Sequence, residues 1–364
     1  MADLVFPPSF LWGTATAAHQ VEGGNANSDW WDWEQRPDAP CLDRSGIACD
    51  HYRRYPDDIA MLAGLGLNAY RYSVEWARIE PEEGSFAQGE LDHYRRMTDA
   101  VRESGMTPMV TLHHFTLPRW LAARGGWMDL GTPARFARYC ETVVRALGDR
   151  VDWYCTINEP GVVAFGGYLG ALGWPPGTHD AESWEQAIDG LIAGHRLALP
   201  AVKTARPSAR VGATHSMQEW DADEGGRPMM EYLRRLNEDV FLEASDQDDF
   251  IGVQTYTRVP IRLGTATSAL LRVALRSPRL MRLVAPPFIR RSAQDPEGTY
   301  PAGTRRTRMG YEFRPEAVAA TIRRAAELLP GKDIVVTEHG VATDDDASAP
   351  SLATTGATAG SPTC

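Results

Sequence analysis

Apolar runs alternate with segments that carry helix signals along this chain, from residue 10 to residue 338. The runs are rich in β-branched and aromatic residues, as is typical of strands, and acidic residues or a glycine mark where helices start and stop. We expect strands over residues 10–20, 69–76, 106–115, 153–160, 210–217, 250–257 and 333–338. We expect helices over residues 57–67, 90–104, 132–147, 184–205, 227–244 and 315–328.

This alternation predicts an α/β fold of parallel βαβ units, because strands and helices follow each other with no break in composition. So many repeats favour a (β/α)8 TIM barrel over an open doubly wound sheet, and the sequence has no glycine fingerprint for a dinucleotide. We expect one barrel domain over residues 1–346. Residues 347–364 are rich in Ala, Ser, Thr, Gly and Pro and are expected to be disordered. The barrel is therefore expected to lack its last β/α unit.

Two of the expected strands end in a glutamate. Residues 153–157 are apolar and β-branched and lead to Asn158 and Glu159, and residues 333–337 lead to Glu338. Ligands bind at the carboxyl ends of parallel strands, and a buried unpaired carboxylate is costly, which favours function over a passive place in the sheet. Two such carboxyl groups suit glycoside hydrolysis, which needs one as acid and one as base or nucleophile.

Charge and composition exclude some classes of function. The 364-residue chain has a formal net charge of -11, which argues against a nucleic-acid partner because nothing offsets the phosphate repulsion. No apolar stretch reaches membrane-spanning length, and no signal peptide is expected. The five cysteines are odd in number and lack metal-ligand spacing, so we expect reduced thiols in a cytoplasm, with Cys140 and Cys155 in the core.

The long connection 258–310 interrupts the alternation. It is basic and apolar over residues 270–291. One interpretation is a lid or surface-seeking amphipathic segment. The other, which we favour, is a solvated excursion that packs leucine and methionine onto the barrel rim.

Five motifs give the chain a recognisable resemblance. They lie at residues 10–23, 70–76, 111–115, 156–160 and 336–340, and the last two read Thr156-Ile-Asn-Glu-Pro160 and Val336-Thr-Glu-His-Gly340. Their order and spacing resemble those of the glycoside hydrolase family 1 β-glucosidases. The resemblance implies a retaining β-glycosidase on a (β/α)8 barrel that acts on a small β-glycoside or oligosaccharide, with no metal and no organic cofactor.

The resemblance also implies residue roles. Glu159 corresponds to the general acid/base and Glu338 to the nucleophile, with the two carboxyls expected roughly 5 Å apart. Asn158 corresponds to the donor to the sugar 2-hydroxyl. Arg71 and Tyr256 correspond to residues that hold the nucleophile ionised and oriented. Gln20 and His114 correspond to residues that bind the sugar hydroxyls.

Other readings of these side chains stay open in the sequence. One alternative is that Arg71 serves as a structural ion-pair partner of Glu75, four residues on. A metal site at His113 and His114 is disfavoured, because adjacent strand residues point to opposite faces and no third ligand stands at useful spacing. Trp120 and Trp127 suit the wall of the site and the core equally well. His19 is expected to be a core residue.

The sequence also departs from the family pattern. Phe115 stands in place of a tryptophan, Gln254-Thr255-Tyr256 in place of Asn-Tyr-Tyr, and His339 in place of an asparagine. The family's final strand motif, which supplies a glutamate and tryptophans to the sugar site, has no counterpart here. We interpret the change of composition after Asp346 as a frameshift or early stop. The alternative to an active β-glycosidase is therefore an inactive or poorly folded relative that at most binds carbohydrate.

Overall fold

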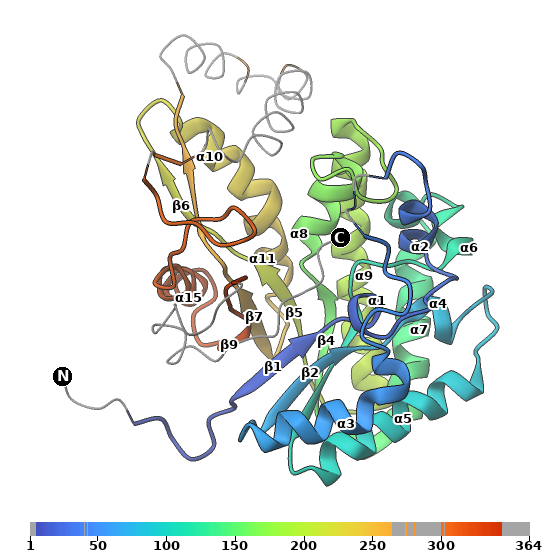
Figure 1. Ribbon diagram of the computed structural model, residues 1–364. Coiled ribbons are helices and arrows are strands. Elements are labelled where there is room, and N and C mark those ends of the chain that lie inside the picture. Colours follow the sequence, from blue (N-terminus) through green and yellow to red (C-terminus); the bar gives the residue numbers. More distant parts are fainter. Residues whose placement is uncertain are drawn as a thin grey trace.

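A computed structural model describes residues 5–39, 41, 43–263, 274, 280, 300–301 and 303–343. Seven parallel strands form one sheet in the order β1-β2-β3-β4-β5-β7-β9 (Figure 1). They are β1 (Gly13–Thr16), β2 (Ala69–Ser73), β3 (Thr107–His113), β4 (Trp153–Asn158), β5 (Arg210–Ser216), β7 (Phe250–Gln254) and β9 (Asp333–Glu338). The sheet curls so that β1 and β9 approach each other, but within the described residues no ladder joins them. The described residues form a (β/α)8 barrel without its last unit, as the sequence predicts.

Helices connect successive strands and cover the outside of the sheet (Figure 1). The long ones are α3 (His51–Gly64), α5 (Gln88–Glu103), α7 (Thr132–Leu147), α9 (Ala181–Ala205), α10 (Arg227–Arg234) and α15 (Ala317–Leu328). A π-helical turn, Arg235–Asp239, joins α10 to α11 (Val240–Ala244). The short ones are α1 (Ala18–Val21), α2 (Asp29–Glu34), α4 (Trp76–Ile79), α6 (Arg119–Ala122) and α8 (Pro160–Val163).

Two expected strands are shorter in the structure, because the residues at their ends belong to short helices or cap them. The strand expected over residues 10–20 is reduced to β1, and His19 and Gln20 lie on α1 instead. The strand expected over 69–76 ends at Ser73, because the Glu75 side chain accepts a hydrogen bond from the backbone of Ala77 and caps α4. The helix expected from residue 57 begins six residues earlier, at His51.

A second, small sheet was not predicted. The strands β6 (Glu219–Ala222) and β8 (Arg258–Ile261) pair in parallel outside the barrel. Both are four residues long and carry charged side chains, so they lack the apolar run that marks a strand. Residues 270–291, for which we weighed a lid against a solvated excursion, lie almost wholly outside the described residues.

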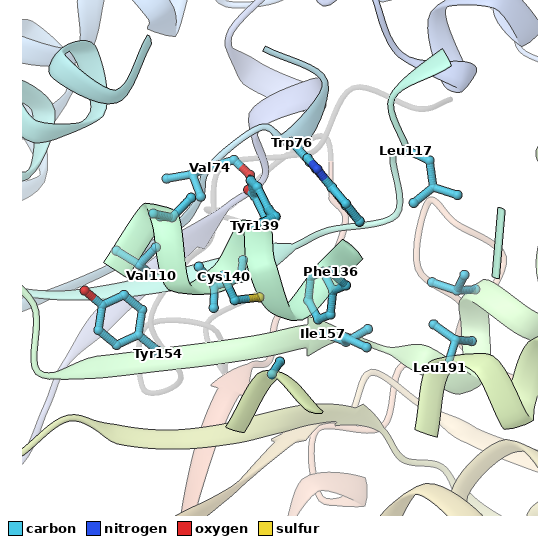
Figure 2. Packing of buried hydrophobic residues seen from close by; sticks show 14 of the residues in the cluster. Val74, Trp76, Val110, Leu117, Phe136, Tyr139, Cys140, Tyr154, Ile157 and Leu191 are labelled. Atoms are coloured by element: carbon cyan, nitrogen blue, oxygen red, sulfur yellow. The ribbon is translucent and has the colours of Figure 1, made fainter. Parts of the chain in front are cut away.

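The main core lies between the sheet and the helices α7 and α9. Figure 2 shows Phe136, Tyr139 and Cys140 of α7 packed against side chains of the strands, among them Val110 and Tyr154. All of these side chains are fully buried. Cys140 and Cys155 are both buried, as expected.

The barrel edges leave apolar side chains in solvent. Near β1, Phe6, Phe10 and Trp12 contact one another with ring centroids 4.6 to 5.0 Å apart, and each is more than a third exposed. On β9, Val336 is 43% exposed. A barrel strand normally has a partner on both sides, so these are the places at which the described sheet is incomplete.

Trp127 is a core residue, which settles one of the two readings that the sequence left open. Its ring is 1% exposed and meets the rings of His113 and Phe136 at centroid distances of 5.2 and 5.5 Å. It also lies so close to α9 that a methyl group added at Gly194 would come within 2.6 Å of it.

We expect Trp127→Ala to lower the free energy of unfolding by about 3–5 kcal/mol, because it removes a large buried ring and leaves a cavity. Urea unfolding followed by tryptophan fluorescence and circular dichroism measures the change. Leu130→Ala is the control, because Leu130 is 97% exposed and its loss is expected to cost less than about 0.5 kcal/mol. Equal stability of the two variants would contradict a core role for Trp127.

Candidate active site

A cavity of about 2500 Å³ opens at the carboxyl ends of the strands. Gln20, Arg71, His114, Asn158, Glu159, Tyr256 and Glu338 all line it. The volume is larger than the roughly 300–1000 Å³ that is usual for a small-molecule site. One reason is that the cavity continues down the barrel to residues at the opposite ends of the strands, such as Ala69 and Asp333.

Glu338 ends β9 and is held by three donors, one from β2 and two from the end of β7 and the residues that follow it. Its Oε1 accepts hydrogen bonds from Arg71 Nη1 at 2.6 Å and from Gln254 Nε2 at 3.0 Å, and its Oε2 accepts one from the Tyr256 hydroxyl. The side chain is 19% exposed. The Arg71 guanidinium and two neutral donors fix this carboxylate in one orientation.

Arg71 projects from β2 into the barrel and is 4% exposed. Besides Glu338 it donates to Asn158 Oδ1 at 2.5 Å and to Thr111 Oγ1 at 3.0 Å. No hydrogen bond or ion pair between Arg71 and Glu75 is found in the described part of the chain. Glu75 instead accepts from Asn25 and Thr116. The alternative of a structural Arg71–Glu75 pair is therefore wrong.

The Asn158 side chain is oriented by its oxygen. Asn158 Oδ1 accepts hydrogen bonds from Arg71, from Gln254 Nε2 at 2.8 Å and from the Thr214 hydroxyl at 3.0 Å. The Asn158 amide nitrogen is thus turned away from these three donors, and it lies 3.3 Å from His114 Nε2. Because amide nitrogens only donate, this geometry leaves Asn158 as a hydrogen-bond donor toward the cavity.

Glu159 follows β4 in a backbone conformation that non-glycine residues rarely adopt, with φ 46° and ψ 58°. Its backbone N–H donates to Thr214 O on β5 at 2.8 Å, which fixes the turn into α8. The residue is 8% exposed. Such strained residues concentrate at functional sites, where the surrounding structure over-determines them.

The two carboxyl groups lie in different surroundings. Burial and, to a smaller extent, the negative charge of Glu338 raise the pKa of Glu159 to about 8, although the Ser216 hydroxyl and Arg71 oppose the rise. Three donors face Glu338 instead. The site therefore places a Glu159 carboxyl group with a raised pKa beside a second carboxyl group that is surrounded by donors.

His114 and Gln20 complete the predicted set. Burial, with a smaller effect from Arg71, holds the pKa of His114 well below its usual value, so the ring is neutral. Since Asn158 donates to His114 Nε2, the ring proton belongs on Nδ1. Gln20 lies half-buried on α1 and faces the cavity. His113, by contrast, packs on Trp127 and Phe136 in the core.

An aromatic wall of the cavity was not predicted. Trp174 contacts Trp30 and Phe115 at centroid distances of 5.0 and 5.2 Å, and Phe115 has a φ of 72°. Neither Trp120 nor Trp127 is among the residues that line the cavity, so the wall role considered for them is wrong.

Two departures from the family pattern have clear places in the structure. The longer side chain of Gln254 spans Asn158 and Glu338 with one amide group. His339 Nδ1 lies 2.7 Å from the backbone oxygen of Thr255 and ties the end of β9 to the segment after β7.

Within the described ranges, no group of three or more His, Cys, Asp or Glu side chains is arranged to hold a metal ion. No helix in those ranges is long and apolar enough to span a membrane.

Comparisons with known proteins agree with this geometry. Residues 3–224 match glycosyl hydrolase family 1. The thermostable β-glucosidase B of Thermobispora bispora is 34% identical over 379 residues, which cover 95% of this chain and 75% of the relative. The β-glucosidase A of Thermotoga maritima is 29% identical over 93% of this chain and 79% of its own length. The crystal structure of β-glycosidase BGL167 matches with a TM-score of 0.79 and 39% identity over 96% of this chain and 82% of that one.

Proposed function

This chain belongs to glycosyl hydrolase family 1, and we propose that it hydrolyses β-linked sugars with retention of configuration, by a double displacement through Glu338. As a member of that family it is a glycoside hydrolase of the β-glucosidase type. The observation that carries the proposal is the contrast between its two carboxyl groups. Glu338 is held as an aimed carboxylate by Arg71, Gln254 and Tyr256, whereas burial and the charge of Glu338 keep Glu159 protonated.

In the first step, a Glu338 oxygen attacks the anomeric carbon while Glu159 gives its proton to the glycosidic oxygen. The bond from the anomeric carbon to the leaving group breaks, and a glycosyl ester on Glu338 forms. Tyr256 stays a neutral donor, because burial and then the Glu338 charge hold its pKa well above its ordinary value.

The second step follows from the change of charge. Once Glu338 is esterified, it no longer raises the pKa of Glu159, so Glu159 ionises and can take a proton from water. The water oxygen attacks the anomeric carbon, the ester bond breaks, and Glu338 returns to a carboxylate. The product keeps the β configuration because two inversions cancel.

We assign sugar binding to the remaining predicted residues. The free N–H of Asn158 suits the 2-hydroxyl, where a hydrogen bond that strengthens in the transition state contributes to the rate. Gln20 and His114 line the same cavity and suit other hydroxyls of that ring. Structures of the related Thermotoga maritima β-glucosidase hold glucoimidazole and deoxynojirimycin, which supports a monosaccharide-sized site.

The stereochemical course tests this proposal. With an aryl β-glucoside as substrate, proton NMR at early times is expected to show β-glucose first and α-glucose only after mutarotation. Immediate appearance of the α-anomer would contradict the double displacement. No hydrolysis of aryl β-glucosides, β-galactosides or β-fucosides by the folded chain would contradict the activity itself.

Tyr256→Phe is expected to lower kcat about 10- to 100-fold, because it removes one of the three hydrogen bonds on Glu338 while leaving the ring in place. Steady-state kinetics with an aryl β-glucoside measures the effect. Tyr300→Phe is the matched control, since Tyr300 lines the same cavity but its hydroxyl donates to the backbone of Arg258. An equal fall in kcat in the two variants would contradict a specific role of the Tyr256 hydroxyl in holding Glu338.

A further inference from the structure

Gln254, the last residue of β7, is fully buried and bonds to two residues of the site with one nitrogen. Its Nε2 donates to Asn158 Oδ1 at 2.8 Å and to Glu338 Oε1 at 3.0 Å. An amide nitrogen carries two hydrogens, so these two bonds use both of them. One side chain therefore contacts the nucleophile and the residue assigned to the sugar 2-hydroxyl at the same time.

The orientation of the Gln254 amide follows from its neighbours. Arg71 can only donate, and its Nη2 lies 2.5 Å from Asn158 Oδ1, so this Asn158 atom is the oxygen. Glu338 Oε1 likewise accepts from Arg71 Nη1 at 2.6 Å. A Gln254 amide turned by 180° would set its own oxygen against both acceptors. Only the observed orientation gives each acceptor a donor.

The other atom of the Gln254 amide gains nothing from this arrangement. Its Oε1 is buried and has no hydrogen-bond partner among the residues that the structure describes. An unpaired buried polar atom destabilises a fold, and an apolar side chain of the same shape would avoid that loss. The two bonds made by Gln254 Nε2 are therefore the feature that explains an amide at this position.

We propose that Gln254 is a positioning residue that couples the nucleophile to the recognition of the sugar 2-hydroxyl. The inference rests on the proposed function, in which Glu338 attacks the anomeric carbon and Asn158 donates to the 2-hydroxyl. These two groups act on adjacent carbon atoms of one ring, so their spacing has to be fixed. Gln254 fixes it by holding Glu338 Oε1 and Asn158 Oδ1 with one amide group.

Arg71 bridges the same pair of residues, but in a different way. It uses two separate guanidinium nitrogens, Nη1 for Glu338 and Nη2 for Asn158, and it brings a full positive charge. Replacing Arg71 would change both the contacts and the charge beside Glu338. Gln254 is the neutral bridge, so its replacement changes the contacts alone and tests the coupling directly.

The test compares an aryl β-glucoside with the matching aryl 2-deoxy-β-glucoside, in the wild type and in Gln254→Met. Methionine is similar to glutamine in length but makes neither bond. For the 2-deoxyglucoside we expect kcat/KM to fall about tenfold, because Glu338 loses one donor. For the glucoside we expect a fall of about 50- to 100-fold, because Asn158 loses a donor as well. The ratio of the two kcat/KM values is thus expected to fall at least about fivefold.

Thr255→Val is the matched control for damage to the end of β7. Thr255 is as buried as Gln254 and follows it in the chain, but its hydroxyl lies 2.7 Å from that of Thr321 on α15. This variant is expected to leave the ratio unchanged. An unchanged ratio in Gln254→Met would overturn the inference, and so would a wild-type rate with the 2-deoxyglucoside in that variant.

Gln254→Glu is the second variant, for the case that Gln254→Met does not fold. It keeps the shape of the side chain, but a protonated carboxyl group has one hydrogen and an ionised one has none. It can therefore serve at most one of the two acceptors. We expect a lower kcat/KM for the glucoside by at least about fivefold. Wild-type kinetics in Gln254→Glu would overturn the inference.

Equilibrium binding separates a failure of the inference from a failure of the proposed function. Titration calorimetry of the full chain with deoxynojirimycin and with its 2-deoxy counterpart needs no turnover. Gln254→Met is expected to raise the Kd of deoxynojirimycin at least about fivefold more than that of the 2-deoxy compound. If the wild type binds both compounds but hydrolyses no glycoside, the proposed function fails and this comparison still decides the inference. If it binds neither compound, both fail.

Discussion

Glu338→Gln is expected to lower kcat for aryl β-glucosides by at least about 10⁴-fold, the largest effect of any single substitution in this chain. The amide cannot form the glycosyl ester, so the first chemical step has no nucleophile. The loss is expected for every leaving group, because no proton donation by Glu159 replaces the missing bond. Stopped assays with a fluorogenic aryl β-glucoside have the sensitivity to measure it.

Two further variants give this prediction its controls. Glu338→Gly is expected to recover activity in the presence of formate or azide, which enter the space of the lost carboxylate and act as nucleophiles. Glu312→Gln is the matched control, because Glu312 is also a partly buried glutamate paired with an arginine, Arg258, but is absent from the cavity wall. Loss of activity in Glu312→Gln as large as in Glu338→Gln would show that the effect comes from general damage to the fold.

Glu159→Ala is expected to have the second-largest effect, and its size depends on the substrate. For an alkyl β-glucoside, kcat/KM is expected to fall about 10²- to 10⁴-fold, because the glycosidic oxygen leaves without a proton. For a 2,4-dinitrophenyl β-glucoside the first step needs no acid, so kcat/KM stays near that of the wild type and only the second step slows. Azide is expected to restore turnover and to yield a β-glucosyl azide.

The pH dependence follows from the same residue. Because the pKa of Glu159 is raised to about 8, kcat/KM of the wild type is expected to fall as the pH rises through that value and the acid ionises. In Glu159→Ala this alkaline limb is expected to disappear. Glu80→Gln is a suitable control, since Glu80 is fully buried and bonded to Trp76 outside the cavity. It is expected to lose stability but to keep the alkaline limb.

The strands that carry the reacting groups could be predicted because a local sequence pattern marks each of them. An apolar run followed by Asn158 and Glu159, or by Glu338, marks a buried strand with functional groups at its end, and the structure has β4 and β9 there. The order of parallel strands around a barrel then brings these ends together. The order of the strands also places Arg71, on β2, close to both Asn158 and Glu338.

The features that the sequence did not indicate depend on contacts between residues that are far apart in the sequence. Trp30, Phe115 and Trp174 meet only after the fold has formed, so no spacing in the sequence marks their wall. Trp127 resembles a wall residue locally, and its core position depends on contacts with His113, Phe136 and α9 that form only in the fold. The strands β6 and β8 are short and charged, and they are held by pairings such as Arg314 with Glu219 rather than by an apolar run.

The central claim is that Glu338 forms a covalent bond to the sugar in this chain. Its most direct test is an intact-mass spectrum of the purified 364-residue protein after incubation with a 2-fluoro β-glucoside carrying a good leaving group. The account predicts a mass gain of one fluorosugar, which peptide mapping places on Glu338. A folded chain of the correct mass that gains no sugar, or gains it on another residue, would contradict the account.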